Sequence, residues 1–357
     1  EQVTQYQNGG FHRLSYADMP MPPRAKHLWR YTPWPRIQPQ DGVPVADKIV
    51  FTVNGNNNLE TGAPRVVLES DIARVFLSEI GGSSHTLNIE GDVGLVHIQA
   101  RASGHVAAGH LHINCKGNST VILHLTGEAD WSGLYISGAV ADNCKLAYGF
   151  INELSNNCKL LHCEDWSVAR DSTMEIAALS VGGFRCKSDV RTTLTETGAS
   201  LKQAVTVHGL GARHIDNHIE INHKVANCNS KLVINSACAG SSRSIATGLL
   251  KVAEGANGTD AGQVFRNLLL SDKARADSIP ELEVLADEVK AAHGAASAPV
   301  NPEQIHYLMS RGLSPQQAEA MIVEGFLIDA FSCLTDTDLK DVLATRMTIH
   351  LECELKR

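Results

Sequence analysis

The chain has 357 residues, of which 43% are hydrophobic and 20% are charged, so it can bury a large core and is not an intrinsically disordered protein. Its 31 lysines and arginines against 39 acidic residues give a net charge of −8, which excludes the basic footprint of a nucleic-acid-binding protein. No apolar run is long enough to span a membrane, and the first residues (EQVTQY) lack the basic and apolar regions of a secretory signal, so we expect a cytoplasmic protein.

Residues 1–60 are predicted to form an irregular N-terminal capping segment. Seven of the 12 prolines fall within the first 45 residues, and an aromatic cluster (WRYTPW) occupies residues 29–34. Proline interrupts both helices and strands. This part of the chain is therefore expected to dock onto a regular core.

Residues 61–296 are predicted to form a parallel β-helix. There is no proline between residues 65 and 279, and proline is excluded from central strands because it cannot donate to the hydrogen-bond ladder. Short runs such as residues 111–113 (LHI) and 219–221 (IEI) alternate apolar with polar residues, which is the period of a strand. No amphipathic helix of about 10 to 15 residues separates these runs, which excludes a doubly wound α/β fold.

Turn residues divide the predicted strands at short intervals. Strand breaks are expected at Gly91-Asp92, Asp142-Asn143 and residues 116–118 (KGN), among others. Of the 20 asparagines, 17 lie between Asn54 and Asn257, and asparagine suits both tight corners and the stacked ladders of repeated coils. A propeller would show an aromatic repeat of about 40 to 50 residues, which is absent. Among sandwiches, barrels and solenoids, this pattern favours the β-helix.

Residues 297–357 are predicted to form a C-terminal helical domain. Asn301-Pro302 is typical of a helix start, and Gly312 of its end. Residues 314–317 (SPQQ) match a capping box that opens a second helix, and a third helix follows Thr337. A solenoid needs covers on its open ends, so these helices either cap the β-helix or present a surface to a partner.

The chain has nine cysteines, and none of them belongs to a CxxC pair. The odd number and the missing secretory signal argue against a disulfide scaffold and predict reduced thiols. The missing pairs argue against a zinc ribbon or a thioredoxin-type motif. Most of the cysteines are expected to be core residues, with one or two available as metal or sulfur ligands.

Several segments resemble, in one order, the motifs of the SufB/SufD family of iron–sulfur cluster assembly scaffolds. Residues 280–295 (PELEVLADEVKAAHGA) are similar to the final strand of that family, and residues 304–326 (QIHYLMSRGLSPQQAEAMIVEGF) to its C-terminal helices. Residues 242–252 (SRSIATGLLKV) and 222–227 (NHKVAN) resemble two further family segments, the second with alanine in place of the usual proline. Residues 29–33 (WRYTP) resemble an element of SufD-like members.

The resemblance implies a right-handed parallel β-helix, in agreement with the pattern of strands and turns. It implies a scaffold on which an iron–sulfur cluster is transiently assembled, and pairing of two chains through their β-helices. The pair would be a homodimer or a complex with a SufB-type chain. It also implies that an ABC-type ATPase, SufC, binds the C-terminal helices. The chain itself would not be an enzyme, and it contains no GxxxxGK[ST] loop for ATP.

Two departures from SufB make the chain SufD-like. Phe265 stands where SufB carries a functional cysteine, and Gly294 stands where SufB has a glutamate. The preceding residue, His293, matches the histidine of the family's "HGA" motif. A neutral imidazole is a good ligand for iron, so His293 is the residue that the resemblance carries over most directly.

The candidate metal ligands are His293, Cys186, Cys228, Cys238 and Glu288. Thiolates are the usual ligands of iron–sulfur clusters, and a carboxylate could hold iron before sulfide arrives. Cys228 and Cys238 are expected to lie in adjacent strand segments just before the family-like core. Any single one of these cysteines is more often a buried core residue than a ligand, and one histidine in each chain is too few ligands for a cluster.

Two other groups of residues allow alternatives. Glu164-Asp165-Trp166 aligns with a SufB stretch associated with a passage through the β-helix, or packs inward in the ordinary way. A set of four histidines could suggest zinc, but strand-surface histidines without a third fixed ligand are usually solvated: His208, His214, His218 and His223.

Three functions therefore remain open. The first is a scaffold that builds a cluster with a partner ATPase. The second is a SufD-like structural partner without its own cluster, which the loss of the cysteine at Phe265 favours. The third is a β-helix polysaccharide lyase, against which the aromatic content of 5% and the missing signal peptide count.

Overall fold

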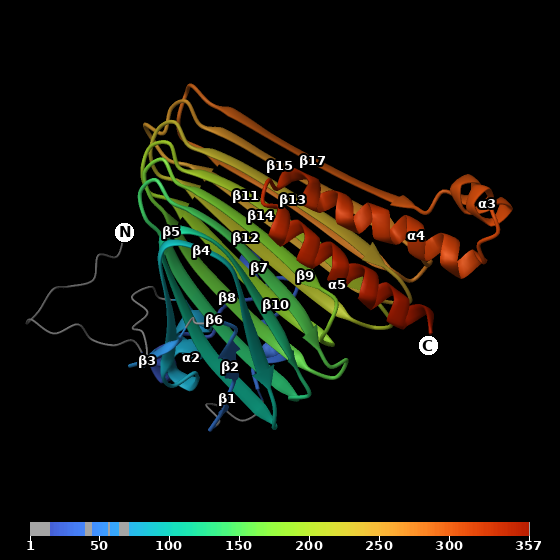
Figure 1. Cartoon of the computed structure of the whole chain (residues 1–357), viewed down its shortest axis with the longest axis horizontal. Helices are drawn as coiled ribbons and strands as arrows, with labels where there is room; N and C mark the ends of the chain where they lie inside the picture. The colour runs from blue at the N-terminus through green and yellow to red at the C-terminus, as the bar shows by residue number, and fades with distance from the viewer. Residues whose placement is uncertain (1–14, 40–44, 56–57, 64–70, 357) are drawn as a thin grey trace, which may run out of the picture.

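The structure is a computed structural model that describes residues 15–39, 45–55, 58–63 and 71–356 (Figure 1). Its largest part is a parallel β-helix of about eight turns, as the sequence predicted. Two long strands open it, β4 (Ser84–Ala102) and β5 (Val106–Gly127). None of the helices in these described ranges is long and apolar enough to cross a membrane.

After β5, two strands make up each turn of the β-helix. One of the two joins a sheet that we call the even sheet: β6 (Trp131–Val140), β8 (Lys159–Val168), β10 (Arg185–Leu194), β12 (His214–His223), β14 (Arg243–Val252) and β16 (Arg275–Val284). The other joins the odd sheet: β7 (Lys145–Leu154), β9 (Thr173–Ser180), β11 (Ser200–Gly209), β13 (Asn229–Cys238), β15 (Asp260–Leu269) and β17 (Lys290–Pro299).

The alternation of side chains along each strand explains why these residues form the two sheets. Residues paired directly across a parallel ladder point to the same side of the sheet, and successive residues of a strand point to opposite sides. Every second row of paired residues therefore faces the interior. Most interior positions are apolar and buried, for example Leu146, Tyr148 and Phe150 on β7. The opposite rows face outward, where the two ends of the chain cover them.

Two of the predicted strand breaks are wrong. Gly91-Asp92 and residues 116–118 lie inside β4 and β5, which turn the corner between the sheets without losing their pairing, apart from a shift in register between Asp92 and Gly94. Gly91 has a φ of 72°, and a Cβ on Gly117 would lie 1.8 Å from the Gly91 carbonyl oxygen. Glycine thus permits a tight corner instead of ending the strand.

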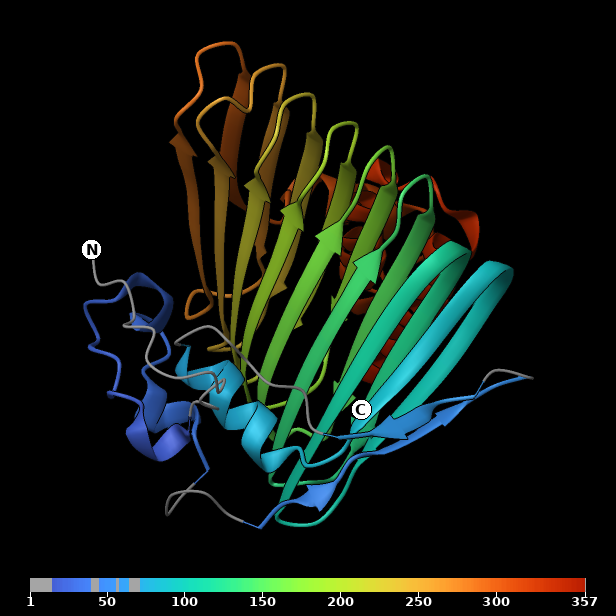
Figure 2. The same ribbon diagram turned by 90° about the vertical axis from the view of Figure 1, so that its left-hand side faces the viewer.

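The N-terminal part covers the outer face of the even sheet and the first edge of the β-helix (Figure 2). Two short strands, β2 (Val50–Val53) and β3 (Glu60–Gly62), pair antiparallel with β4, and β1 (Asp47–Lys48) pairs with β5. Helix α2 (Ile72–Ile80) packs with Trp29, Trp34 and Trp131 in one aromatic cluster. Three short helical turns complete this part: η1 (Tyr16–Asp18), η2 (His27–Trp29) and α1 (Trp34–Ile37).

The C-terminal helices begin where the sequence predicted. Helix α3 (Pro302–Ser310) is capped by Asn301, and α4 (Pro315–Ile328) opens with the complete capping box of Ser314 and Gln317. A short 3-10 turn, η3 (Asp329–Cys333), leads to α5 (Thr337–Leu355).

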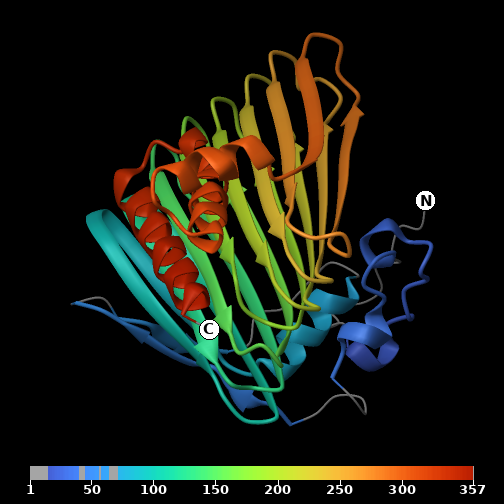
Figure 3. The ribbon, with the colours of Figure 1, turned by 90° about the vertical axis from the view of Figure 1, so that its right-hand side faces the viewer.

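These helices lie along the outer face of the odd sheet (Figure 3). Leu339, Leu343 and Met347 of α5 are fully buried in one cluster with Ile151 and Leu179 of the sheet. The helices therefore cover a face of the β-helix and do not cap its open end. The last coil, β16 and β17, has one pairing partner for each strand among the described residues.

Candidate functional site

The last coil carries His293, the first of the predicted ligands. His293 lies on β17 and is exposed, like most residues of that strand. It pairs in register with Gln263 of β15, so both side chains belong to the row that faces the interior. Because no further coil follows, this interior row opens to solvent at His293.

A groove of about 470 Å³ runs beside His293, and its lining includes Lys202, Lys231 and Asp260. Beneath the last coil, the Gln263 side chain donates to the Glu281 carbonyl oxygen at 2.9 Å. Its own Oε1 atom is buried without a hydrogen-bond partner among the described residues. The open end of the β-helix thus presents an imidazole above an unpaired acceptor.

The three predicted cysteine ligands are buried and do not meet. Cys228 lies directly before β13 and Cys238 ends it, so the expectation that they sit in adjacent strand segments is wrong. Ten residues of extended strand separate them by roughly 33 Å. Cys186 lies on β10 in the other sheet, where its thiol contacts Asn152 and the Gly182 carbonyl oxygen.

Burial also makes these thiols poor ligands. It raises the pKa of Cys186 to about 12 and that of Cys238 to about 11, and it raises the pKa of Cys228 as well. The thiolate is the form that binds metal, so a protonated core thiol must first be exposed or deprotonated. Nine free cysteines are present, and these three are core residues in the folded chain.

Glu288 is exposed in the loop between β16 and β17, and its carbonyl oxygen accepts a hydrogen bond from Gly258. No group of three or more histidine, cysteine or acidic side chains that could hold a metal ion occurs among the described residues. Phe265 is fully buried in the interior of β15. Of the five predicted ligands, His293 and Glu288 are therefore the two with exposed side chains, and they lie at separate positions.

Glu164 points into the β-helix, where its carboxylate accepts a hydrogen bond from Trp166 Nε1 at 2.7 Å. His162 lies 3.0 Å from the same carboxylate and stacks on Phe150. The cavity beside them has a volume of about 20 Å³, which is room for about one water molecule. Of the two alternatives for this stretch, inward packing matches the structure.

The four histidines considered for zinc occupy separate places and are largely buried. His208 pairs with His350 at 2.9 Å, and His214 contacts Thr32 at 2.9 Å. His223 contacts Ser230 inside the β-helix, and His218 is buried beside Asp189. They share no metal site, and the expectation that they would be solvated is wrong.

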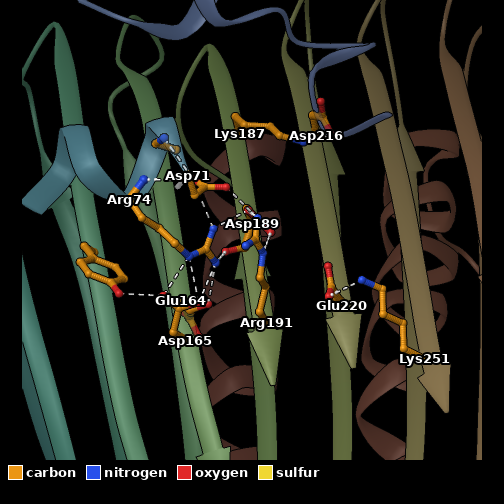
Figure 4. Close-up of polar contacts among 12 residues, drawn as sticks. Asp71, Arg74, Glu164, Asp165, Lys187, Asp189, Arg191, Asp216, Glu220 and Lys251 are labelled. Atoms are coloured by element: carbon orange, nitrogen blue, oxygen red, sulfur yellow. Dashed lines mark hydrogen bonds and ion pairs between the residues drawn. The ribbon is translucent and has the colours of Figure 1, made fainter. Parts of the chain in front are cut away.

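A buried ion network that sequence reasoning missed joins α2 to the even sheet (Figure 4). Arg74, 1% exposed, reaches Asp189 at 2.6 Å and Asp165 at 2.8 Å. Arg191 binds Asp189 at 2.8 Å and Asp71 at 2.9 Å. Burial opposes the charge of Asp189, but Arg74 and Arg191 hold the pKa of that carboxyl well below its usual range.

A second buried pair lies beside this network on the same face, with Lys187 on β10 and Asp216 on the neighbouring strand β12. Lys187 donates to Asp216 at 2.9 Å (Figure 4). Thr32 of the N-terminal part donates to the other oxygen of Asp216 at 2.6 Å. The signal in the sequence was an arginine inside the apolar run of α2, at Arg74. A charge at that position requires a buried partner, although the sequence does not show which one.

The C-terminal helices hold a groove of about 710 Å³ between α3, α4 and β15. Its lining is mainly apolar and includes Leu308, Ile322 and Phe326. Two further large side chains of this groove are exposed, Tyr307 at 57% and Met321 at 48%. An exposed apolar groove of this kind is typical of a protein-binding surface.

Comparisons with known proteins agree with the motifs. Residues 96–326 match the family model described as SUF system FeS cluster assembly, SufBD core domain. This match covers the β-helix from β4 to β17 and continues into α4.

The chain is also similar to individual proteins of iron–sulfur cluster assembly. The chain is 30% identical over 244 residues to the iron–sulfur cluster assembly protein SufD of Escherichia coli, covering 67% of this chain and 57% of that protein. It is 25% identical over 356 residues to an iron–sulfur cluster assembly SufBD family protein of Mycobacterium tuberculosis, covering 92% and 88%. It is 31% identical over 187 residues to SufD of Bacillus subtilis, covering 52% and 43%.

Proposed function

Because the chain belongs to the SufB/SufD family of iron–sulfur cluster assembly proteins, we propose that it is a scaffold subunit on which a cluster is assembled at the open end of the β-helix. A second chain and an ABC-type ATPase of the SufC kind would take part. The observation that carries the proposal is the exposed His293 on an uncovered last coil. Iron and sulfide are the cargo of this scaffold.

The composition of the last coil supports a second chain. A cluster needs about four ligands, and among the described residues of one chain no group of three or more histidine, cysteine or acidic side chains could hold a metal ion. The free edges of β16 and β17 present unpaired backbone groups that a further strand can bind. A two-fold axis through this end would double every ligand, which favours a homodimer, and a SufB-type chain would instead add its cysteine.

The groove between α3 and α4 supports an ATPase partner. Tyr307 and Met321 expose apolar surface there, although the rest of α4 and α5 is packed on the odd sheet. The chain would supply the docking surface and the partner would hydrolyse ATP. The work of the chain would then be binding, without catalysis of its own. Its nine reduced cysteines suit the cytoplasm, where we expect it to act.

The test of cluster assembly is anaerobic reconstitution of the full chain, purified together with its partner ATPase. Iron and sulfide are then counted, and absorption spectra are recorded. We expect His293→Ala to lower the iron retained by each dimer. His105→Ala, which removes an imidazole exposed at 84% at the opposite end, is the matched control and should retain the wild-type amount. Equal iron in both variants would contradict the assignment of His293.

The test of the ATPase surface must keep the helices, because deleting them would expose the apolar face of the odd sheet. We expect Met321→Asp with Tyr307→Asp to abolish co-purification of the ATPase while the chain stays folded. Ile349→Asp, on an exposed position of α5, is the control. Retention of the ATPase by the double variant would place its binding surface elsewhere.

A second candidate function is a SufD-like structural partner without a cluster of its own. Phe265 and the buried thiols of Cys228 and Cys238 support it, because they leave the chain without an accessible sulfur ligand near His293. In that case Cys228→Ser with Cys238→Ser would leave the cluster chromophore of the complex unchanged. Loss of the chromophore, with normal folding, would favour the cluster-building scaffold.

A further inference from the structure

A row of basic residues runs across the outer face of the even sheet. The first residues of five successive strands pair directly in register: Lys159, Arg185, His214, Arg243 and Arg275. Neighbouring strands lie about 4.8 Å apart, so the row brings four cationic side chains and an imidazole within roughly 19 Å. We call this row the basic ladder.

The N-terminal part adds three more arginines in front of the basic ladder. A pocket of about 530 Å³ is lined by the following residues: Arg24, Ala25, Arg30, Tyr31, Arg36, His214 and Arg243. The Tyr31 ring lies between two of its cations, 6.0 Å from the Arg30 guanidinium and 5.5 Å from that of Arg243. The Nε2 atom of His214 lies 2.9 Å from the Thr32 hydroxyl, so the imidazole is held in place.

The positive charge of this pocket is only partly neutralised. Arg243 binds Asp277 at 2.7 Å, whereas no carboxylate partner occurs among the described residues for the other three arginines of the pocket, Arg24, Arg30 and Arg36. The same holds for Arg185, which pairs with His214 in the basic ladder. Like charges opposite one another in a ladder destabilise a sheet. In a chain with a net charge of −8, such a concentration of cations without a carboxylate partner in the part of the chain that the structure describes favours binding of an external anion.

Two titration shifts agree with this charge imbalance. Burial, and then the neighbouring charge of Arg36, lower the pKa of Arg185. Burial lowers the pKa of His214 to about 4, and Arg185 and Arg243 contribute in the same direction against the pull of Asp216. Besides burial, neighbouring cations thus contribute to both shifts.

We propose that this pocket binds a small anion with two or more phosphate groups. Guanidinium groups bind phosphate oxygens in pairs of parallel hydrogen bonds, and several arginines with no carboxylate partner match more than one phosphate. The volume exceeds the needs of a single phosphate and lies within the range of small-molecule sites. Inorganic pyrophosphate and a nucleoside diphosphate share this chemistry. The site is separate from the open end of the β-helix.

The test is isothermal titration calorimetry of the full chain at low ionic strength with pyrophosphate and, separately, with ADP. We expect saturable binding of one anion to each chain. Equal affinity for the two probes would show that the site recognises the phosphate groups alone. Tighter binding of ADP would show that the site also contacts the nucleoside. Either result supports the site.

Three variants locate the binding. Arg36→Gln, at an exposed position of α1, should weaken binding by about tenfold or more, because one charge-assisted pair is lost. Arg185→Gln with Arg243→Gln should abolish it. Arg101→Gln removes an exposed arginine on β4 and is the control for the change in net charge, so it should leave binding unchanged.

Two results would overturn the proposal. One is the absence of saturable binding by the wild-type chain for both probes. The other is equal affinity of the Arg36→Gln and Arg101→Gln variants, which would show non-specific attraction to positive charge. Arg36→Gln changes no buried contact of the even sheet and leaves the ion pair of Arg243 with Asp277 in place. We therefore expect this variant to fold normally, and circular dichroism checks it.

Discussion

Arg74 is the side chain on which the contact between α2 and the even sheet depends. It is buried, and it balances the carboxylates of Asp189 and Asp165 from two neighbouring strands. Tyr135 also donates to Asp165 at 2.7 Å, so the network is hydrogen-bonded on both sides. A buried ion pair adds little net stability over an apolar pair, but removing one partner leaves an uncompensated charge.

We therefore expect Arg74→Met to lower the free energy of unfolding by about 3–5 kcal/mol. Urea unfolding followed by circular dichroism measures it. Arg170→Met is the matched control, because Arg170 and Glu196 form an exposed pair worth about 0–1 kcal/mol. Similar losses in the two variants would show that the buried network does not hold α2 in place.

Buried histidines make stability depend on pH. Burial lowers the pKa of His208 to about 3 and that of His218 to about 4, from an ordinary value of 6.5. Below that ordinary value, the unfolded chain binds protons that the folded chain does not, so acid favours unfolding. Stability should therefore fall as the pH decreases from about 6.5 to 4.

The contribution of one histidine to the pH dependence of stability can be measured. We expect His218→Gln to reduce the slope of unfolding free energy against pH by up to about 1.4 kcal/mol per pH unit, measured by urea unfolding at a series of pH values. His105→Gln, at an exposed position, is the control and should keep the wild-type slope. An unchanged slope in His218→Gln would assign the acid sensitivity to other groups.

At the scale of single elements, β4 and β5 are unusual because each crosses from one sheet to the other without ending. The corner depends on Gly117, whose missing Cβ makes room for the backbone of Gly91. A side chain there would force the two strands apart and break their register. The sequence contains both glycines, but their local pattern predicts the ends of strands, because it does not show that the two residues meet.

Gly117→Ala is therefore expected to lower the free energy of unfolding by about 1–3 kcal/mol, as overpacking of a closed contact does. Thermal unfolding measures the change. Gly262→Ala on β15 is the control, because a Cβ at that position meets no atom within 4 Å. If both substitutions had the same small effect, the first corner would be looser than its contacts indicate.

The C-terminal helices show the difference between local and tertiary information. Their starts follow from Asn301, Ser314 and Gln317, whose side chains bond to nearby backbone groups. Where they pack depends on the outer row of the odd sheet, where Ile151 and Leu179 need a cover. Capping is decided within a few residues, whereas the face that a helix covers is decided by residues far along the chain.

For the molecule as a whole, both outer faces of the β-helix are covered, and the N-terminal part reaches β16 through the contact of His27 with Glu281, while the strands of the last coil keep a free edge among the described residues. The N-terminal part lies on the even sheet and the helices on the odd sheet, so a partner strand can still reach β16 and β17 (Figures 1 and 2). Val284 and Leu285 expose apolar side chains at the end of β16. These features favour association through the last coil.

We expect sedimentation equilibrium to give twice the chain mass of 38.5 kDa. Val284→Glu with Leu285→Glu should shift the protein to the monomer, since it places charges on the associating end. Val45→Glu, at a fully exposed position of the N-terminal part, should not. A wild-type chain that sediments as a monomer would instead favour a complex with a SufB-type chain.

The sequence by itself determined the class of fold, the family and most of the helix starts. Alternation at residues such as those of 219–221, the long stretch without proline, and the caps at Asn301 and Ser314 are local patterns that neighbouring residues decide. The motif around His293 likewise lies within one short segment, and it led to the open end of the β-helix.

Only the tertiary structure decided which distant residues meet. Cys228 and Cys238 are close in sequence, yet a straight strand keeps them at its two ends. Arg74 and Asp189 are far apart in sequence, yet the winding of the coils brings them to 2.6 Å. The basic ladder has the same origin, because its members recur once in each coil and become neighbours only when the coils stack. Pairing between coils depends on register, and register is set by the core that all coils share.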